Sequence, residues 1–574
     1  GLGLAKVSSV PVAEMVAGQA SFAVTHAQHV GIGTLPIVYF GTEAQKRRYL
    51  PGLATAELTS AYALTEPGSG SDALSAKTRA VLDDSGEHYL LTGEKMWITN
   101  GGFADVIVVF AKVDGERFTA FVVDRDTPGV TYGAEEHKLG LRGSSTVAIR
   151  FENARVPVAN VLGEVGGGHK IAFNILNVGR FKLGAYAVGG AKTAFGEAVR
   201  YARDRKQFGQ SISNFGLIQR KIAEMVIRIY AAESMVYRTA GLVDALLGTL
   251  EDGAALVSLE EYAVECSIIK VWNSEMLGYV VDEEMQIFGG NGYSEDYAAE
   301  RHYRDARINR VFEGTNEINR RLIPGMLVKR AMKGDLPLLE AAQRVVDEVA
   351  TVTDDDASDT AASASRSIAD AKRAALLVAG AAVRRYREGL TTEQQLLGNI
   401  ADIVMQIYAG ESALLRARKL AGTGGPRAEV ALDMARVLVI DSVEAIDSWA
   451  KQGLASTLEG DDFRDRKVAL LRAVRAVPLG EVPGVAGREA AGADPVRQCL
   501  RDALAGVVPG CGVAGPRVAE AHHEAEGDGG LAGPLAGGGR ATRPAARRRP
   551  RHGRRPGRRR PWRRAGVPRT PRRA

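Results

Sequence analysis

Cysteine is scarce in this chain, which has three among its 574 residues. Cys266, Cys499 and Cys511 show neither zinc-site nor disulfide spacing, so we interpret them as packing or incidental residues that suit a reducing compartment. Long apolar runs are lacking too. No stretch reaches the roughly 18 apolar residues that a spanning helix needs, which excludes such a helix from this sequence. What the chain has is length, enough for about three or four packed units and a large core.

Acidic residues are missing from the end of the chain, where residues 540–574 hold 16 Arg and no Asp or Glu. Subtracting those 16 charges from the net charge of +6 leaves −10, so the body of the protein is acidic. Residues 486–574 are rich in Gly, Pro and Arg and poor in large apolar residues, which predicts a disordered tail. Such a tail attracts polyanions by charge alone, and we expect no specific nucleic-acid partner.

The spacing of apolar residues divides the body of the chain into regions. Residues 1–60 are typical of short helices, one of them capped at Thr42 and stopped at Pro51. Because the sequence opens with Gly-Leu-Gly-Leu rather than Met, we expect this region to be the remnant of a truncated helical domain. Residues 61–165 form short β-rich runs between Gly and Asp turns, as in a small antiparallel barrel or sandwich. Residues 166–325 return to the helical period.

A further helical region, residues 326–485, contains an echo of the one before it. Residues 400–412 align with residues 222–234, sharing an initial Ile-Ala-acid, a central Ile-Tyr-Ala and a final Glu-Ser. We interpret residues 326–485 as a degenerate second copy of the helical bundle, with a structural role. In the first copy, one apolar stripe predicts the core-facing side of a helix. Its residues are Ile222, Met225, Val226 and Ile229.

Five motifs carry residues that are useful for chemistry. They are residues 65–72 (Thr-Glu-Pro-Gly-Ser-Gly-Ser-Asp), 96–100 (Met-Trp-Ile-Thr-Asn), 205–209 (Arg-Lys-Gln-Phe-Gly), 286–292 (Gln-Ile-Phe-Gly-Gly-Asn-Gly) and 311–318 (Val-Phe-Glu-Gly-Thr-Asn-Glu-Ile). The last motif places a carboxylate beside a glycine at a break between helical patterns, which makes Glu313 our candidate catalytic base. The glycines of the fourth follow a helical pattern, not a strand, which disfavours a Rossmann dinucleotide site.

In this order the five motifs resemble those of the acyl-CoA dehydrogenases, a family of flavoenzymes. Residues 208–219 and the long C-terminal extension are most similar to the very-long-chain branch of that family. The resemblance implies an α+β fold, mainly α, with an N-terminal helical domain, a central antiparallel β-barrel or sandwich and a C-terminal four-helix bundle, here followed by an extra helical domain. It also implies FAD, because a hydride must leave Cβ of the acyl chain and no side chain accepts hydride.

The resemblance assigns flavin contacts to several motifs. Trp97 would stack on the isoalloxazine and Thr99 would bond near its reactive nitrogen; a barrel-core aromatic is the alternative for Trp97. Arg205 matches a clamp on the FAD pyrophosphate that reaches over from a neighbouring subunit, so FAD binding would require a dimer. The second helical copy has no such motif, and we expect it to bind no flavin. The expected cofactor-binding set is Leu64, Thr65, Gly70, Ser71, Trp97, Ile98, Thr99, Arg205, Gln207, Phe208, Gln286, Gly289, Gly290, Thr315 and Glu317.

Glu313 is expected to lie against the acyl chain, with its carboxylate desolvated so that its pKa moves toward neutrality. A helix-capping Glu is the alternative. Some family members carry the base one residue before the Arg that matches Arg180, but here that residue is Gly179. Asn177 and Arg180 match positions that hold the CoA portion and order the wall beside the base, and Phe312 stands where Tyr is frequent. The expected substrate set is Ser71, Asn177, Arg180, Phe312 and Gly314.

Histidine offers no competing chemistry. His137, His169 and His302 are scattered along the chain, and we expect them in surface or capping roles, with no metal site. The function predicted is FAD-dependent α,β-dehydrogenation of a long-chain fatty acyl-CoA to trans-2-enoyl-CoA in fatty acid β-oxidation, with electrons passing to an electron-transfer flavoprotein. An acyl-CoA oxidase that uses the same base, and an inactive scaffold homologue, are the alternatives.

The same resemblance implies a homodimer, because the extension covers the surface with which other members pair dimers. The segment that docks the very-long-chain branch to a membrane corresponds to a stretch rich in Ala and Asp, which includes residues 354–356. A good interfacial helix needs a basic face, so we expect weak membrane association at most. Richness in Ala, Gly and Arg indicates a bacterial, cytoplasmic protein, or a mitochondrial one if the source is eukaryotic.

Overall fold

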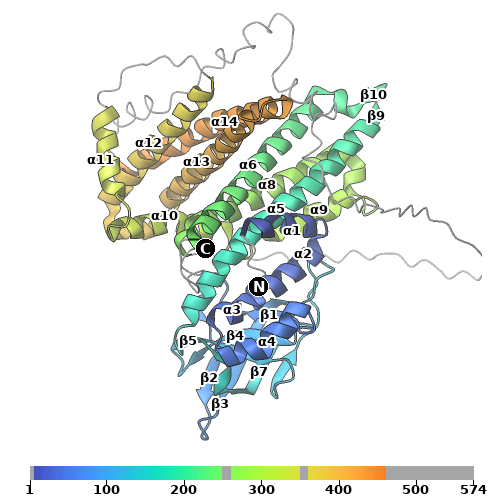
Figure 1. The fold of residues 1–574 in the computed structure, drawn as a ribbon, viewed down its shortest axis with the longest axis vertical. Helices are drawn as coiled ribbons and strands as arrows, with labels where there is room; N and C mark the ends of the chain where they lie inside the picture. Colours follow the sequence, from blue (N-terminus) through green and yellow to red (C-terminus); the bar gives the residue numbers. More distant parts are fainter. Residues whose placement is uncertain (1–5, 249–259, 350–359, 460–574) are drawn as a thin grey trace, which may run out of the picture. The chain divides into compact units, whose positions relative to one another are not determined.

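The computed structural model describes residues 6–248, 260–349 and 360–459 and shows an α+β fold, mainly α (Figure 1). The predicted tail at residues 486–574, the Asp run at 354–356, Cys499 and Cys511 lie outside the described residues. Among the helices of the described ranges, none is long and apolar enough to cross a membrane.

The N-terminal region consists of short helices, as predicted. They are α1 (Ser9–Val16), α2 (Ala20–Ala27), the π-helix η2 (Gln28–Gly33), α3 (Leu35–Phe40) and α4 (Glu43–Thr55). The predicted cap of α4 is confirmed, since the Thr42 Oγ1 accepts from the Gln45 N–H at 3.2 Å. The predicted stop at Pro51 is wrong. Tyr49 and Leu53 on either side are buried, and this packing carries α4 through the proline.

One eight-stranded sheet forms the β region. Its strands are β1 (Ser60–Ala63), β2 (Arg79–Leu82), β3 (His88–Thr99), β4 (Val106–Val113), β5 (Arg117–Asp124), β6 (Val130–Tyr132), β7 (Thr146–Pro157) and β8 (Val161–Leu162). The order is β6-β7-β3-β2-β4-β5-β8, with β1 added on β4. Most pairs are antiparallel, as predicted, but β4 pairs parallel with both β1 and β2.

One face of the sheet is buried along its length, and the other is buried along β4 and β5 but exposed along much of β7. One face packs on itself through residues such as Leu91, Phe121 and Phe151. The other face packs against the N-terminal helices and the first turns of the next helix, with Ile37 and Ile171 among its members. In β7 buried and exposed residues alternate, which fixes the register of that strand, because a slip by one residue would turn its apolar side chains to the exposed face.

A first bundle follows the sheet. It consists of α5 (Gly168–Asp204), α6 (Gly216–Leu247), α8 (Ala263–Phe288) and α10 (Asn316–Met332), with the short hairpin β9 (Lys206–Gln207) and β10 (Gln210–Ser211) after α5 and α9 (Ala298–Ala306) after α8. The predicted core stripe of α6 is confirmed, since Ile222, Met225, Val226 and Ile229 are all buried. The border predicted between residues 325 and 326 falls inside α10, which continues to Met332.

The C-terminal bundle consists of α12 (Thr360–Tyr386), α13 (Gln394–Ala421) and α14 (Pro426–Thr457), preceded by α11 (Leu338–Val349). It shares one continuous apolar core with the first bundle. The two segments aligned in sequence, on α6 and α13, lie in contact (Figure 1). The second copy predicted from the sequence therefore packs against the first along the matched helices.

Contacts across this interface are mirrored. The guanidinium of Arg238 lies 4.8 Å from the ring of Tyr408, and that of Arg416 lies 4.7 Å from the ring of Tyr230. Arg416 follows Arg238 by 178 residues and Tyr408 follows Tyr230 by 178 residues, which is also the offset between residues 222 and 400. The acids are mirrored as well: Glu411 pairs with Arg238 and Lys372, and Glu233 pairs with Arg416 and Lys192. The two bundles thus meet like two copies of one subunit about a local two-fold axis.

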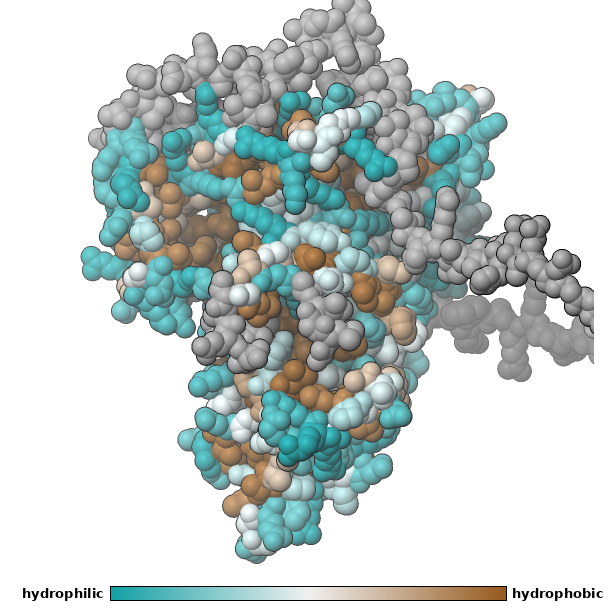
Figure 2. Space-filling model, viewed as in Figure 1, coloured by the Kyte–Doolittle hydropathy of each residue, from teal (hydrophilic) through white to brown (hydrophobic). Residues whose placement is uncertain are grey.

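Polar residues dominate the face of the helices seen in Figure 2, and apolar residues show between them in separate patches.

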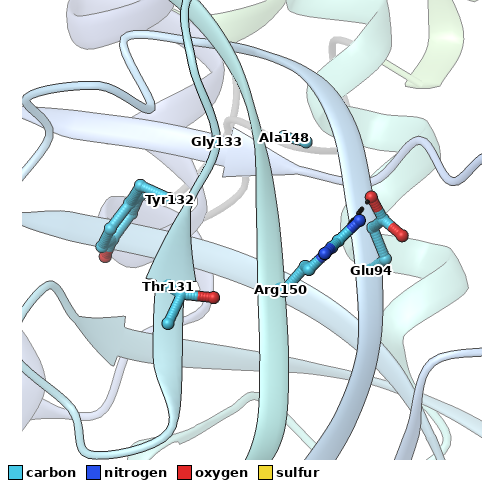
Figure 3. A pocket seen from close by; sticks show the side chains of 6 residues that line it. All are labelled: Glu94, Thr131, Tyr132, Gly133, Ala148 and Arg150. Atoms are coloured by element: carbon cyan, nitrogen blue, oxygen red, sulfur yellow. Dashed lines mark ion pairs between the residues drawn. The ribbon is translucent and has the colours of Figure 1, made fainter.

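A depression on the outer side of the sheet contains none of the predicted site residues (Figure 3). It is lined by Glu94, Thr131, Tyr132, Gly133, Ala148 and Arg150. An exposed ion pair, Arg150 Nε to Glu94 Oε1 at 3.4 Å, closes one side of it, so we assign it no function.

Candidate active site and flavin-binding surface

Glu313 sits on a short loop that leads into α10. Its φ is +58° and that of Gly314 is +77°, so two successive residues are left-handed. A left-handed conformation is uncommon for a residue with a long side chain and persists only when its surroundings hold it. Thr315 caps the helix, its Oγ1 accepting from the Ile318 N–H at 3.3 Å. Thr315, not Glu313, is therefore the cap, which removes the helix-capping alternative for Glu313.

Three buried side chains hold this loop. Arg180 Nε donates to the Glu313 carbonyl at 3.2 Å, and Asn319 Nδ2 donates to the Gly314 carbonyl at 2.9 Å. Lys270 Nζ also donates to the Gly314 carbonyl, at 2.7 Å. These donors come from α5, α10 and α8, so the strained loop is fixed from three sides.

The Glu313 carboxyl points at α5. A Cβ added to Gly179 would lie 2.5 Å from Glu313 Oε2, so only glycine leaves room for the carboxyl there. Oε2 is buried and has no hydrogen-bond partner among the described residues. Burial raises the pKa of Glu313 to about 7, although the positive charges of Arg180 and of protonated Lys270 oppose the rise. Burial also lowers the pKa of Lys270 to about 7, so Lys270 carries its full charge only below neutral pH. The carboxyl is thus half-ionised near neutral pH, as suits a general base.

The loop after β1 connects the base to the expected flavin contacts. Tyr62 at the middle of β1 is buried, and burial together with the nearby Glu313 carboxyl raises its pKa. Three residues further along the chain, the Thr65 carbonyl accepts from the Met96 N–H at 3.0 Å. The structure therefore brings Leu64 and Thr65 together with the strand that carries Trp97.

A buried ion pair anchors this junction. Lys95 Nζ donates to Glu66 Oε1 at 2.6 Å and to the Leu64 carbonyl at 3.2 Å. Burial lowers the pKa of Lys95 to about 8, opposed by the Glu66 charge. Burial alone would raise the pKa of Glu66, but Lys95 and donors from Thr78 and Lys77 bring it below its usual value. Removal of either partner would leave an uncompensated charge inside the β region.

Trp97 lies on the surface beside this anchor. Its φ is +59°, at an irregularity in the pairing of β3 with β7, and 53% of the residue is exposed. The barrel-core alternative for Trp97 is therefore wrong. Thr99 is half-buried, whereas the Ile98 side chain is in the core, so Ile98 can reach a cofactor only through its backbone.

Gly70 and Ser71 are exposed on the adjoining loop, where an added Cβ at Gly70 would meet no atom within 4 Å. A flat aromatic cofactor such as flavin fits this surface. The surface offers open glycine backbone, hydroxyl groups and a half-exposed indole, next to the buried carboxyl of Glu313. The described residues that would hold its ring system are Leu64, Thr65, Gly70, Ser71, Trp97 and Thr99.

A second group of expected residues lies at the other end of α5. Arg205, Gln207 and Phe208 are exposed in the β9–β10 hairpin, and 94% of Phe208 is accessible. The Tyr201 ring stacks on Phe288 with centroids 4.0 Å apart, which brings this hairpin near Gln286, Gly289 and Gly290. An α-helix rises 1.5 Å per residue, so the stretch from Gly179 to Arg205 separates the two groups by roughly 40 Å within one chain.

The other expected residues lie close to the Glu313 loop. Asn177 and Arg180 are buried and bonded to each other at 2.9 Å, so they order the loop from inside. Phe312 and Gly314 are partly accessible, and Glu317 is exposed in the first turn of α10.

Sequence reasoning missed the residues that hold the site. Lys270, Asn316, Asn319 and the Lys95–Glu66 pair are all nearly inaccessible. One signal existed: Lys270 interrupts the apolar run of residues 268–272, and a lone lysine there marks a buried amine with a specific partner.

His302 corrects another expectation. His137 and His169 are exposed, but the His302 side chain is only 15% exposed, and its Nδ1 lies 3.0 Å from Oε2 of the buried Glu284. With Glu197 these residues form a cluster whose ligand atoms lie within 4.8 Å of one another. Because His302 and Glu284 satisfy each other directly, we assign the cluster a structural role. The prediction failed because the partner is 18 residues away, on another helix.

Comparisons with known proteins agree with this geometry. Four family profiles match the chain in the order of their names: acyl-CoA dehydrogenase N-terminal domain at residues 1–57, middle domain at 61–154 and C-terminal domain at 166–326. The fourth, also described as an acyl-CoA dehydrogenase C-terminal domain, matches residues 370–473. A profile with the same description thus falls on each bundle.

Two relatives each match three quarters of this chain or more. A probable acyl-CoA dehydrogenase of Bacillus subtilis is 48% identical over 486 residues, covering 83% of this chain and 82% of the relative. The human very long-chain specific acyl-CoA dehydrogenase, mitochondrial, is 38% identical over 458 residues, 75% of this chain and 68% of the human protein.

A solved structure repeats the architecture. The acyl-CoA dehydrogenase of Bacillus anthracis complexed with FAD superimposes with a TM-score of 0.83 at 48% identity, covering 88% of this chain and 86% of that one. Motifs, fold, profiles and relatives agree, and the chain belongs to the acyl-CoA dehydrogenase family of FAD-dependent oxidoreductases.

Proposed function

We propose that this protein introduces a double bond between Cα and Cβ of a long-chain acyl-CoA, giving the trans-2-enoyl-CoA, with Glu313 as the base. One observation supports this above the others: the Glu313 carboxyl, whose Oε2 is buried and unpartnered among the described residues and whose pKa is near 7, lies against Gly179 on a loop held by Arg180 and Lys270. FAD, when bound, accepts the hydride that leaves Cβ.

The chain's own residues supply the proton chemistry. Glu313 Oε2, uncommitted to any described donor, takes the α-proton. The Glu313 backbone N–H would donate to the thioester carbonyl, which makes the α-proton more acidic. Arg180 and Lys270 keep both groups in place through the Glu313 and Gly314 carbonyls. Ser71, Phe312 and Gly314 would line the substrate, with Asn177 behind them.

Finer features of the proposal rest on relatives and on helix geometry. The human relative's name supports a very long acyl chain. A place in fatty acid β-oxidation and an electron-transfer flavoprotein as acceptor belong to the proposal as what the family resemblance implies. Roughly 40 Å of α5 separates Gly179 from Arg205, more than one flavin dinucleotide spans. Arg205, Gln207, Phe208, Gln286, Gly289 and Gly290 would therefore bind the FAD of a second subunit in a homodimer, in a bacterial cytoplasm.

The test is the visible spectrum of the purified chain, loaded with FAD, on anaerobic addition of palmitoyl-CoA. We expect bleaching of the flavin whose rate rises with pH through about 7, because only the ionised Glu313 accepts a proton. Glu313→Gln should slow bleaching by about 10²- to 10⁴-fold.

A matched control is Glu265→Gln, which makes the same change at another carboxyl whose pKa burial raises, on α8. It should bleach at the wild-type rate. A wild-type flavin that ignores acyl-CoA would sink the proposal and favour the scaffold alternative. Rapid re-oxidation by oxygen after bleaching would identify an oxidase instead.

A further inference from the structure

A series of polar contacts connects the C-terminal bundle to the Glu313 loop. At the loop, Lys270 Nζ donates to the Gly314 carbonyl and to Asn316 Oδ1, both at 2.7 Å. Asn316 Nδ2 donates in turn to Glu275 Oε1 at 2.9 Å. Lys270 and Asn316 are nearly inaccessible, so these bonds exchange little with water.

Arg320 completes the series. Its Nη1 and Nη2 donate to the two Glu275 oxygens at 2.7 and 2.9 Å, and its Nε donates to Asp402 Oδ1 at 2.8 Å. A planar guanidinium that meets two carboxylates has little freedom to turn. Asp402, on α13, therefore sets where Arg320 lies on α10.

The geometry differs from that of an ordinary surface ion pair. The Arg320 and Asp402 side chains are 22% and 20% exposed, so solvent screens them only in part. Asn316 and Arg320 are four residues apart on α10 and share Glu275. A displacement of Arg320 is thus transmitted one helical turn back, to the residue whose amide oxygen accepts from Lys270.

The first bundle contains a residue that corresponds to Asp402 and makes different contacts. Its counterpart, 178 residues earlier, is Glu224, which accepts from the Tyr279 hydroxyl and from Arg220 within its own bundle. The equivalent acid therefore bonds within its own bundle in one copy, whereas in the other it bonds to α10, the helix that follows the loop of the candidate base.

From these contacts we infer that Asp402 is a positioning residue for Glu313, acting through Arg320, Glu275, Asn316 and Lys270. The C-terminal bundle then has a second role besides covering the first one. The inference rests on the proposed function only for its effect on rate; the mechanical link itself can be measured without turnover.

The first experiment follows amide hydrogen exchange by mass spectrometry in the FAD-loaded full chain. We expect Asp402→Asn to speed exchange in peptides that cover residues 311–320 by at least about threefold, since the loop loses its outer support. Asp370→Asn is the control: Asp370 is also 20% exposed and also pairs with an arginine, Arg373, but on its own helix α12. Unchanged exchange in the Asp402 variant overturns the inference, whatever its activity.

The second experiment measures flavin reduction by palmitoyl-CoA against pH. Asp402→Asn should lower the maximal rate by about 3- to 30-fold and move its midpoint above the wild-type value, because Lys270 no longer stays close to the Glu313 carboxyl. Loss of the Asp402 charge alone would move the midpoint the other way. A downward shift, or an equal loss in the Asp370 control, would contradict positioning.

Glu275→Gln tests the same series from the middle. If Asp402 acts through Glu275, the double variant should lose little more rate than the worse single variant. Additive losses would place the effect of Asp402 elsewhere. A wild-type protein that fails to reduce its flavin would refute the proposed function, while the exchange result would still decide the link.

Discussion

The two bundles repeat one design but bury different residues. Among the described side chains of α12, α13 and α14, the buried polar residues all carry hydroxyls: Ser367, Ser412, Ser442 and Thr457. Helix α8 alone buries Lys270, Asn273 and Glu284, and α5 and α10 add Arg180, Asn316 and Asn319. The copies therefore differ in the chemistry that they hide from water.

This difference has a physical reason. A buried hydroxyl can be satisfied by its own helix, as Ser412 Oγ is by the Tyr408 carbonyl at 2.6 Å. Lys270 and Arg180 instead donate to carbonyls of a loop distant in sequence, the one that carries Glu313, and Arg180 donates to the Asn177 side chain as well. Buried ionic groups cost stability and define geometry, so they persist where a geometry is needed.

The largest effect on the rate of flavin reduction is expected from Gly179→Ala, which should disturb the site in the first bundle and leave the C-terminal bundle unchanged. The new Cβ would lie 2.5 Å from Glu313 Oε2 and force the carboxyl aside. We expect flavin reduction to slow by about 10²-fold or more. Gly190→Ala, on the same helix with 3.5 Å of clearance to Leu277, should reduce its flavin normally. An active Gly179 variant would show that the carboxyl can work from another position.

Lys270→Met would give α8 the apolar character of α14. The variant loses two hydrogen bonds to the loop and the positive charge that opposes the rise of the Glu313 pKa. We expect roughly tenfold slower flavin reduction and a pH midpoint above about 7. Lys372→Met, in the C-terminal bundle, should leave the midpoint in place. A midpoint that stays or falls in the Lys270 variant would mean that its charge does not act on Glu313.

Glu313→Gln should make the first bundle more stable at high pH. The folded-state pKa of Glu313 is about 7 against a usual 4.5, so the folded protein holds this proton more tightly and loses stability as pH rises from about 4.5 to about 7. The variant escapes that loss, by up to about 3 kcal/mol at pH 8 and less than about 1 kcal/mol at pH 5. Urea unfolding at both pH values measures it, and a gain that is equal at both would refute the pKa argument.

The smallest expected effect is a difference in unfolding free energy between variants of the two mirrored acids, Glu233 and Glu411. Glu233 is 14% exposed and Glu411 is 24%, although each pairs with one arginine and one lysine. Glu233→Gln should therefore cost more unfolding free energy than Glu411→Gln, about 2 against about 1 kcal/mol. Thermal unfolding of the two variants tests this order. Equal losses would show that the two halves of the interface are energetically alike.

Patterns within short stretches of the sequence predicted much of the fold and the candidate catalytic base. The α6 stripe, the cap at Thr42, the alternation of helical and β regions and the candidate base all follow from residues close together in the chain. Partners distant in sequence could not be predicted. The parallel pairing of β4 joins residues 106 and 60, and the bonds of Lys270 join α8 to a loop 44 residues later.

The same limit explains the wrong predictions. Pro51 lacks a donor wherever it stands, but only tertiary burial of Tyr49 and Leu53 shows that α4 survives it. His302 looks isolated until the fold places Glu284 beside it. Assignment of a role to Asp402 needs three helices at once, and no pattern within one helix contains that information.

The left-handed backbone at Glu313 affects which residues selection would retain at position 313. Asparagine or glycine would adopt that conformation more readily, and neither would confine a carboxyl without a partner. Mutation under selection for stability alone would thus remove glutamate from this position early. The proposed function accounts for glutamate at this position, because only turnover needs a carboxyl there, and a homologue with Gly or Asn at the same site is expected to keep the fold without the chemistry.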